Sequence, residues 1–205
     1  IYHPPATPEP ILKGISLELA PQELGLVVGP SGSGKSTLLE ILAGFVEWHS
    51  GAVYWRNQDL TPDHLQQLCG LVFQFPERHF CGNTILEELR LGHIDLDGDR
   101  LDASLQAVGL AQIPLNASPN SLSGGQQRRL ALAVQLIRQP GLLLLDEPTA
   151  GLDWSMRRQL LKLLANLTKD WTLLVVSHEP EEHKSIADRS WQISHGRLTP
   201  LVGNS

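Results

Sequence analysis

One glycine-rich stretch constrains this chain more than any other part of its sequence. Residues 29–37 read Gly-Pro-Ser-Gly-Ser-Gly-Lys-Ser-Thr and fit the pattern G-x-x-x-x-G-K-[ST]. The apolar run Leu24–Val28 before this stretch predicts a buried strand, and Lys35–Ala43 after it predicts a helix. A strand, a glycine-rich loop and a helix in this order form the context in which the pattern binds phosphate. That context disfavours the alternative of a simple glycine–serine turn.

The chemistry of this loop predicts a site for a nucleoside triphosphate. Glycines allow the positive φ values with which the loop curls its N–H groups toward phosphate oxygens. The following helix adds the positive end of its dipole. We expect Lys35 to reach the β- and γ-phosphates and the Ser36 hydroxyl to bind Mg²⁺. The predicted nucleotide-binding loop comprises Gly29, Pro30, Ser31, Gly32, Ser33, Gly34, Lys35, Ser36 and Thr37.

A second element of the same site is predicted at the end of a strongly apolar segment. Leu142–Leu145 has the length and composition of a fully buried strand, Asp146 ends it and Glu147 follows. The Asp146 carboxylate is placed to reach Mg²⁺ through its water shell, and Glu147 to orient or deprotonate an attacking water. Alone, these two carboxylates would serve equally well as caps of the next segment. Beside the glycine-rich loop, the catalytic interpretation is favoured.

A third motif reads Leu122-Ser123-Gly124-Gly125-Gln126. Serine and glycine at a helix start make an anion site, although Ser-Gly-Gly alone is also common as a helix cap. With all three motifs present, the chain resembles the ATP-binding cassette (ABC) ATPases along its whole length. In that family the third motif is the signature loop, which serves the ATP held by the opposite subunit. The resemblance therefore implies a dimer in which two cassettes sandwich two nucleotides.

The same resemblance assigns roles to single residues. Gln74 matches the Q-loop glutamine at the Mg²⁺ and water site, and His178 matches the switch histidine at the γ-phosphate. Asp153 matches the D-loop that crosses the dimer interface. Tyr2 matches the aromatic ring that stacks on adenine, with an exposed terminal aromatic as the alternative. The resemblance thus implies Glu147, His178 and Gln74 as catalytic residues, and Ser36, Gln74 and Asp146 around Mg²⁺.

Strands alternating with helices predict an α/β fold with a mostly parallel sheet. The resemblance implies a P-loop NTPase core with an antiparallel β edge and a small helical subdomain. We expect one ABC ATPase domain over 1–205, with its core at 1–75 and 123–205 and the helical subdomain at 76–122. Besides the strands and helix already named, the patterns predict strands at Ile15–Leu19, Gly51–Trp55, Leu71–Gln74, Thr172–Val176, Ser190–Ser194 and Arg197–Leu201, and helices within 84–110, at Gln126–Ile137 and at Trp154–Leu167.

Composition narrows the choice of partners and compartment. A net charge of −6 disfavours a nucleic-acid surface. No apolar run reaches the roughly 20 residues that span a bilayer, so a membrane role must come through partner chains. Cys69 and Cys81 fit free thiols in a reducing compartment. We expect a cytoplasmic protein held on the inner face of the membrane by partner subunits. No signal peptide is visible, and because Ile1 is not a translation start, we expect native residues before it.

One segment narrows the choice of family branch. Residues 72–80 read Val-Phe-Gln-Phe-Pro-Glu-Arg-His-Phe, and together with 83–88 they are similar to the ATPases of energy-coupling-factor importers. That branch serves vitamins and transition-metal ions such as cobalt and nickel, and it has relatives in cyanobacteria and plastids. It usually carries an additional C-terminal segment. Phe80, beside the Q-loop, is expected to dock a helix of the membrane partner.

The leading hypothesis is therefore an ATP-hydrolysing subunit that powers an importer. Its expected partners are a second ABC ATPase subunit, in a homo- or heterodimer, and integral membrane transporter subunits. The alternative is a soluble single-cassette ABC ATPase in cofactor assembly or another non-transport role. A third class, the non-hydrolysing scaffold, is disfavoured because such chains tend to lose the catalytic glutamate or the switch histidine, and Glu147 and His178 are both present.

Overall fold

The computed structural model describes residues 10–92, 96–179 and 183–201 of the 205-residue chain. Within these ranges, no helix combines the length and apolar character that crossing a membrane requires. Cys69 is buried and Cys81 exposed, and both are free thiols, as predicted. Burial raises the pKa of the Cys69 thiol to about 12.

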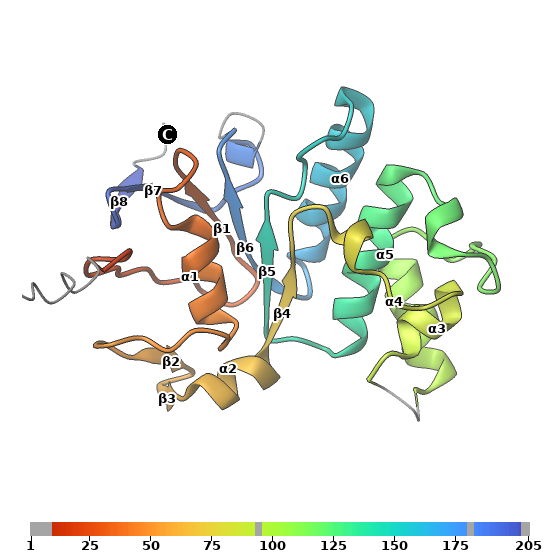
Figure 1. Cartoon of the computed structure of the whole chain (residues 1–205), viewed down its shortest axis with the longest axis horizontal. Coiled ribbons are helices and arrows are strands. Elements are labelled where there is room, and N and C mark those ends of the chain that lie inside the picture. The colour runs from red at the N-terminus through yellow and green to blue at the C-terminus, as the bar shows by residue number, and fades with distance from the viewer. Residues whose placement is uncertain (1–9, 93–95, 180–182, 202–205) are drawn as a thin grey trace, which may run out of the picture.

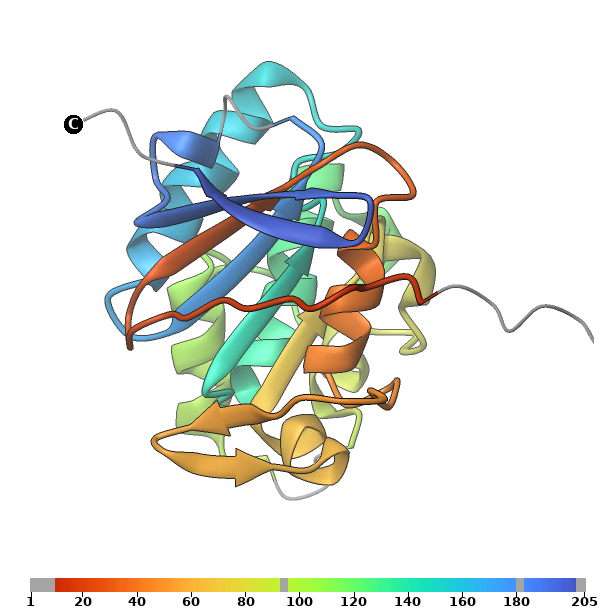
Figure 2. The same ribbon diagram turned by 90° about the vertical axis from the view of Figure 1, so that its left-hand side faces the viewer.

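A six-stranded sheet forms the centre of the molecule, in the order β4-β5-β6-β1-β7-β8 (Figures 1 and 2). The neighbouring pairs from β4 to β7 are parallel, and β8 pairs antiparallel with β7 at one edge. This arrangement confirms the predicted α/β class with an antiparallel edge. The strands are β1 (Leu24–Val28), β4 (Cys69–Val72), β5 (Leu142–Asp146), β6 (Thr172–Ser177), β7 (Arg189–Ser194) and β8 (Arg197–Leu201), and a separate hairpin consists of β2 (Val53–Trp55) and β3 (Gln58–Leu60).

Helices cover both faces of the sheet, because successive side chains of a strand point to opposite faces. On β5, Leu144 belongs to the core beneath one set of helices, while Leu143 and Leu145 belong to the core beneath the other. The first set is α1 (Lys35–Leu42) and α2 (Pro62–Leu68). The second set is α3 (Ile85–Arg90), α4 (Gly98–Ala107), α5 (Gly124–Ile137) and α6 (Trp154–Leu167), with the short 3₁₀ turns η1 (Pro76–His79) and η2 (Pro119–Ser121).

The apolar patterns located most of the elements correctly. The predicted strand at Leu24–Val28 and helix at Trp154–Leu167 have the observed bounds. The last two strands form the predicted hairpin through His195-Gly196, both of which adopt positive φ. The helical pattern in 84–110 is confirmed as α3 and α4.

Two strand predictions need correction. Ile15–Leu19 is not a strand: Ile15, Leu17 and Leu19 pack on the core beside α1, but the backbone of this segment joins no ladder in the described structure. The alternation therefore reports which side chains face the core and not strand pairing. The strand predicted at Leu71–Gln74 begins earlier and ends at Val72, so Gln74 lies beyond it.

One helix escaped the apolar pattern. The helix α2 begins with a capping box, in which the Thr61 hydroxyl accepts from the His64 N–H and the His64 ring accepts from the Thr61 N–H. Pro62 occupies the first helical position, where its missing N–H costs nothing. Thr-Pro-x-His was the available signal in the sequence.

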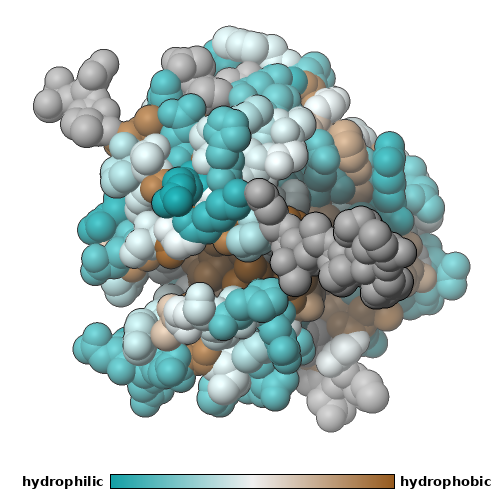
Figure 3. Space-filling model, turned by 60° about the vertical axis from the view of Figure 1, so that its left-hand side comes forward, coloured by the Kyte–Doolittle hydropathy of each residue, from teal (hydrophilic) through white to brown (hydrophobic). Residues whose placement is uncertain are grey.

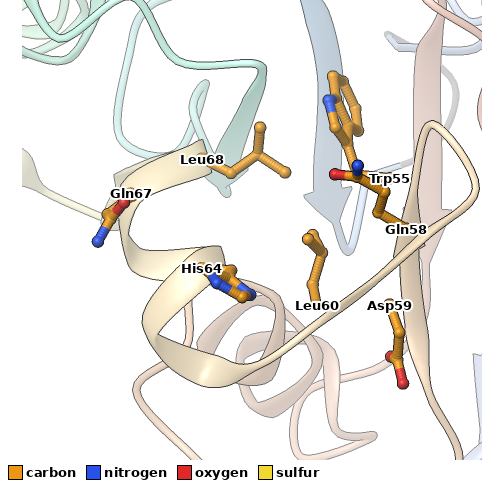
Figure 4. A pocket seen from close by; sticks show the side chains of 7 residues that line it. All are labelled: Trp55, Gln58, Asp59, Leu60, His64, Gln67 and Leu68. Atoms are coloured by element: carbon orange, nitrogen blue, oxygen red, sulfur yellow. The ribbon is translucent and has the colours of Figure 1, made fainter.

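A hollow with hydrophobic surface lies on the side shown in Figure 3. Figure 4 shows a separate view of a cavity of about 330 Å³ beside the β2–β3 hairpin, lined by Trp55, Leu60, His64 and Leu68 together with Gln58, Asp59 and Gln67. Among the described residues, none that is predicted to bind nucleotide lines this cavity. The candidate site lies elsewhere, at the ends of the parallel strands.

Candidate functional site

The predicted site residues come together because four neighbouring parallel strands end at one edge of the sheet. Val72 of β4 pairs with Leu145 of β5, and Asp146 pairs with Val176 of β6. On the other side of β6, Ser177 pairs with Val28 of β1. The residues just beyond these strand ends are Gln74, Glu147, His178 and Gly29. The region outside the carboxyl ends of parallel strands is where open α/β sheets bind ligands.

The loop between β1 and α1 depends on glycine at two positions. A Cβ at Gly29 would come within 2.5 Å of the Ile193 carbonyl oxygen, so no other residue fits there without displacing β7. Gly34 has φ +100° and immediately precedes Lys35, the first residue of α1. Because the N-cap residue is Gly34, it has no side chain of its own to cap this helix end. The loop thus places the first N–H groups of α1 and the positive end of its dipole at the strand edge.

Lys35 folds over the loop that precedes it. Its side chain is 7% exposed, and its Nζ donates to the carbonyl oxygens of Gly29 at 2.8 Å and Pro30 at 3.1 Å. The same Nζ lies 3.7 Å from Oε1 of Glu147. The ammonium group is therefore held by weak carbonyl partners and one carboxylate. A phosphate oxygen can replace these partners with a stronger charge-assisted bond.

Ser36 and Asp146 meet directly, although they lie far apart in the sequence. The Ser36 hydroxyl donates to Oδ2 of Asp146 at 2.8 Å. Burial raises the pKa of the Asp146 carboxyl, and the Ser36 hydrogen bond opposes that shift. A hydroxyl and a partly desolvated carboxylate are oxygen ligands that suit Mg²⁺, and a cation beside them favours the charged carboxylate. The pair fits the predicted metal site.

Glu147 lies between Lys35 and His178. It is 7% exposed and adopts φ +46°, an uncommon conformation for a non-glycine residue. Its Oε2 accepts from the His178 N–H at 3.1 Å and lies 2.8 Å from Nδ1 of the same ring. The backbone N–H of Glu147 donates to the Val176 carbonyl at 3.0 Å, which fixes the turn after β5. The carboxylate is therefore held in one orientation at the strand edge.

Gln74 and the signature loop are more exposed. Gln74 is an exposed side chain beyond β4, at the same sheet edge as Asp146 and Glu147. Ser123 caps α5 in a capping box, in which its hydroxyl accepts from the Gln126 N–H and Oε1 of Gln126 accepts from the Ser123 N–H. Ser123 and Gly124 face solvent, and α5 covers the opposite face of the sheet from α1. Leu122 and Gly125 are half-buried neighbours in this loop.

The remaining predicted residues have separate positions. Asp153 caps α6, and its Oδ1 accepts from the Met156 N–H at 2.9 Å. Tyr2, predicted to stack on adenine, lies outside the described residues. Within the loop, Ser33 and Gly34 are buried, whereas Pro30, Ser31 and Gly32 are exposed. Thr37 is half-buried in α1.

Sequence reasoning missed the ion pair between Arg157 and Glu179 beside the site. Arg157 of α6 donates through Nη1 to Oε2 of Glu179 at 2.6 Å and through Nε to the Leu152 carbonyl at 2.8 Å. The pair connects the turn before α6 with the residue after His178. Twenty-two positions separate Arg157 from Glu179, and no local pattern predicts their contact.

Comparison with known proteins decides the family. The family profile described as "ABC transporter" matches residues 12–150, more than half of the chain. The chain belongs to the ABC transporter family. As predicted, relatives come from plastids and from energy-coupling-factor systems. The chloroplastic ABC transporter I family member 11 of Arabidopsis thaliana is 43% identical over 95% of this chain and 76% of its own. The energy-coupling factor transporter ATP-binding protein EcfA2 of Acetivibrio thermocellus is 34% identical, covering 91% and 70%.

Solved structures confirm the fold. The structure of cbiO1 from Clostridium perfringens, described as part of the ABC transporter complex cbiONQ, superposes with a TM-score of 0.87. The two proteins share 28% sequence identity, and the match covers 95% of this chain and 82% of the other. The overall fold described above is therefore that of an ABC cassette.

The position of Lys35 makes a first prediction. Lys35→Ala removes the only ammonium group described at the loop, and a hydrogen bond to a charged group contributes about 1.5–3 kcal/mol. ATP affinity should therefore fall about tenfold or more. Titration with a fluorescent ATP analogue measures the change, with Lys162→Ala on the exposed side of α6 as the matched control. Equal affinity in both variants would show that this loop does not hold the nucleotide.

Proposed function

We propose that this chain is the ATP-binding and ATP-hydrolysing subunit that powers an ABC membrane transporter, an importer of a vitamin or a transition-metal ion. The observation that carries the proposal is the convergence of Lys35, Ser36, Asp146, Glu147 and His178 at one sheet edge. The similarity to an energy-coupling factor transporter ATP-binding protein and to a component of cbiONQ supports the importer branch. The transported solute binds to other subunits.

Different residues of the site are proposed to bind the phosphates, the Mg²⁺ ion and the adenine ring. The backbone N–H groups of residues 29–37 and the Lys35 ammonium bind the phosphates. Ser36 and Asp146, with Gln74 at the same edge, would hold Mg²⁺. The ion, when bound, neutralises charge on the β- and γ-phosphate oxygens. Tyr2 is proposed to stack on the adenine ring.

Glu147 is the proposed general base, and its contacts explain how its carboxylate is oriented for that role. When ATP phosphates draw Lys35 away from Oε1, Glu147 keeps its two contacts with His178 through Oε2. Oε1 is then available to orient or accept a proton from the attacking water. Because the backbone bond to Val176 and the His178 contacts fix the carboxylate, its orientation survives the exchange of partners. His178 is proposed to contact the γ-phosphate from the same side.

The signature loop is proposed to act on the nucleotide of a second subunit. The phosphate loop begins α1 on one face of the sheet, and Leu122–Gln126 begins α5 on the other. Exposed Ser123 and Gly124 leave the start of α5 open to an anion from outside the chain. Asp153, at the start of α6, would lie in the same dimer interface. Residues 1–75 and 123–205 are proposed as the core of one ABC domain and 76–122 as its helical subdomain.

An exposed aromatic patch beside the Q-loop supports a membrane partner. Phe45 and Phe73 are 58% and 39% exposed, and their rings stack with centroids 6.5 Å apart. The His79 ring lies 5.4 Å from that of Phe73. Phe80, expected at this surface from the sequence, is instead half-buried and packs on the core of the helical region. We propose that the Phe45–Phe73–His79 patch docks the integral membrane subunits and holds the chain on the cytoplasmic face.

The role of Glu147 predicts a separation of binding from hydrolysis. Glu147→Gln keeps the shape of the side chain and its ability to accept from the His178 N–H, but removes the base. ATP binding should persist, turnover should fall by at least about a hundredfold, and an ATP-bound dimer should accumulate on size-exclusion with Mg²⁺. Glu18→Gln on the surface is the control. Turnover near that of the unmodified chain would remove Glu147 from the mechanism.

A mixing experiment tests whether the signature loop acts in trans. Ser123→Arg places bulk and charge where the partner's γ-phosphate should lie, so ATP binding by each chain should survive while hydrolysis is lost. Mixing Ser123→Arg with Lys35→Ala should recover part of the phosphate release, since each mixed dimer holds one intact composite site. Ser50→Arg, at an exposed bend, is the control. Full activity of Ser123→Arg alone contradicts the sandwich arrangement.

The aromatic patch predicts a variant that uncouples docking from chemistry. Phe73→Asp places a charge in the patch, and burying it against a partner is unfavourable. The isolated chain should still bind ATP, but integral membrane chains should no longer co-purify with it. Tyr54→Asp is the matched control, since Tyr54 is a 67% exposed aromatic on β2 outside the patch. Undiminished co-purification with Phe73→Asp would show that docking uses another surface.

A further inference from the structure

The buried guanidinium group of Arg128, on the helix α5 that begins at the signature loop, has no role in the site described so far. Arg128 lies in the second turn of α5 and is 4% exposed. Desolvation lowers the pKa of its guanidinium, and the Glu77 carboxylate opposes that shift. Burying a charge is unfavourable unless other groups compensate it. The contacts of Arg128 therefore identify the groups that compensate its buried charge.

The guanidinium group joins two loops that reach the candidate site. Nη2 donates to the Ala150 carbonyl at 2.9 Å, in the turn between β5 and α6. Nη1 lies 3.7 Å from Oε2 of Glu77, in the loop after β4, and neither atom has a hydrogen-bond partner among the described residues. Figure 1 shows this loop beside α5. One side chain thus holds the turn that contains Gly151 and Asp153 and the loop that contains Gln74.

Phe75 completes the connection. Its ring centroid lies 5.2 Å from the Arg128 guanidinium carbon and 4.8 Å from that of Arg78. Its backbone adopts φ +55° and ψ +56°, an unfavourable conformation for an aromatic residue, so its surroundings must hold it there. Gly151 lies against the same ring, because a Cβ at Gly151 would come within 3.2 Å of Cε1 of Phe75.

We infer that Arg128 is a positioning residue for ATP hydrolysis, which sets the Q-loop and the D-loop relative to the helix that begins at the signature loop. The inference rests on the proposed function. Phe75 directly follows Gln74 in the chain, and Ala150 lies three residues before Asp153. Any displacement of the loop after β4 must therefore either break the Arg128 contacts or move α5 and the D-loop with it. Arg128 acts through these loops and does not touch the reacting atoms.

The test compares variants that keep the charge with variants that remove the stacking partner. Arg128→Lys keeps a buried cation near Glu77 but loses the planar fork that reaches Ala150 and Phe75 together. Its kcat should fall about tenfold or more, while ATP affinity and the thermal unfolding midpoint stay near those of the unmodified chain. Phe75→Leu should lower kcat similarly, and adding Arg128→Lys to it should cause little further loss. Arg56→Lys, an exposed arginine over Trp55, is the matched control.

Outcomes of this test separate the inference from the proposed function. An unmodified chain that does not hydrolyse ATP with any partner contradicts the proposed function. If the unmodified chain hydrolyses ATP and Arg128→Lys has the same kcat, only the inference fails. Losses that simply multiply in the double variant, or a kcat that falls in parallel with the unfolding midpoint, show a structural role and also overturn it. To avoid an unpaired carboxylate when charge is removed, Arg128→Met is measured together with Glu77→Gln, and it should match the loss in Arg128→Lys.

Discussion

Parallel pairing of β4, β5, β6 and β1 is the constraint on which the rest of the structure depends. It brings the carboxyl ends of four strands to one edge, where residues separated by more than a hundred positions become neighbours. The contact between Ser36 and Asp146 exists only because β1 and β5 lie on either side of β6. The helices on both faces serve this arrangement by burying the strands' apolar side chains. The proposed phosphate, metal and general-base sites therefore all depend on one sheet topology.

Local backbone strain and buried charged side chains are both found at or beside this edge. Glu147 and Phe75 both adopt positive φ, and each is held by contacts from other strands or helices. Lys35, Glu147 and Arg128 are charged and almost fully buried. Such features are unfavourable for folding and persist at sites where position matters for function. In the proposed mechanism, Lys35 exchanges its partners at this edge when nucleotide binds.

The sequence predicted the parts of this arrangement that depend on local chemistry. The glycine-rich loop, the strand ending at Asp146 and the amphipathic helix α6 carry strong local patterns, and the structure has them where expected. The strand predicted at Ile15–Leu19 was wrong because the burial of alternate side chains does not require a paired backbone. Contacts such as Arg157 with Glu179, or Arg128 with Phe75, depend on how distant segments pack, which no local spacing encodes. Phe80 was predicted at an exposed docking surface but is half-buried against the core of the helical region. The exposure of a side chain also depends on how distant segments pack.

The central claim is that the carboxyl edge of the sheet holds a magnesium nucleotide between Lys35, Ser36 and Asp146. A crystal structure with Mg²⁺ and a non-hydrolysable ATP analogue tests it directly. We predict that Nζ of Lys35 leaves the Gly29 and Pro30 carbonyls for a phosphate oxygen, and that Mg²⁺ separates the Ser36 hydroxyl from Asp146. An analogue bound elsewhere, with the bonds from Lys35 to Gly29 and from Ser36 to Asp146 unchanged, would contradict the account.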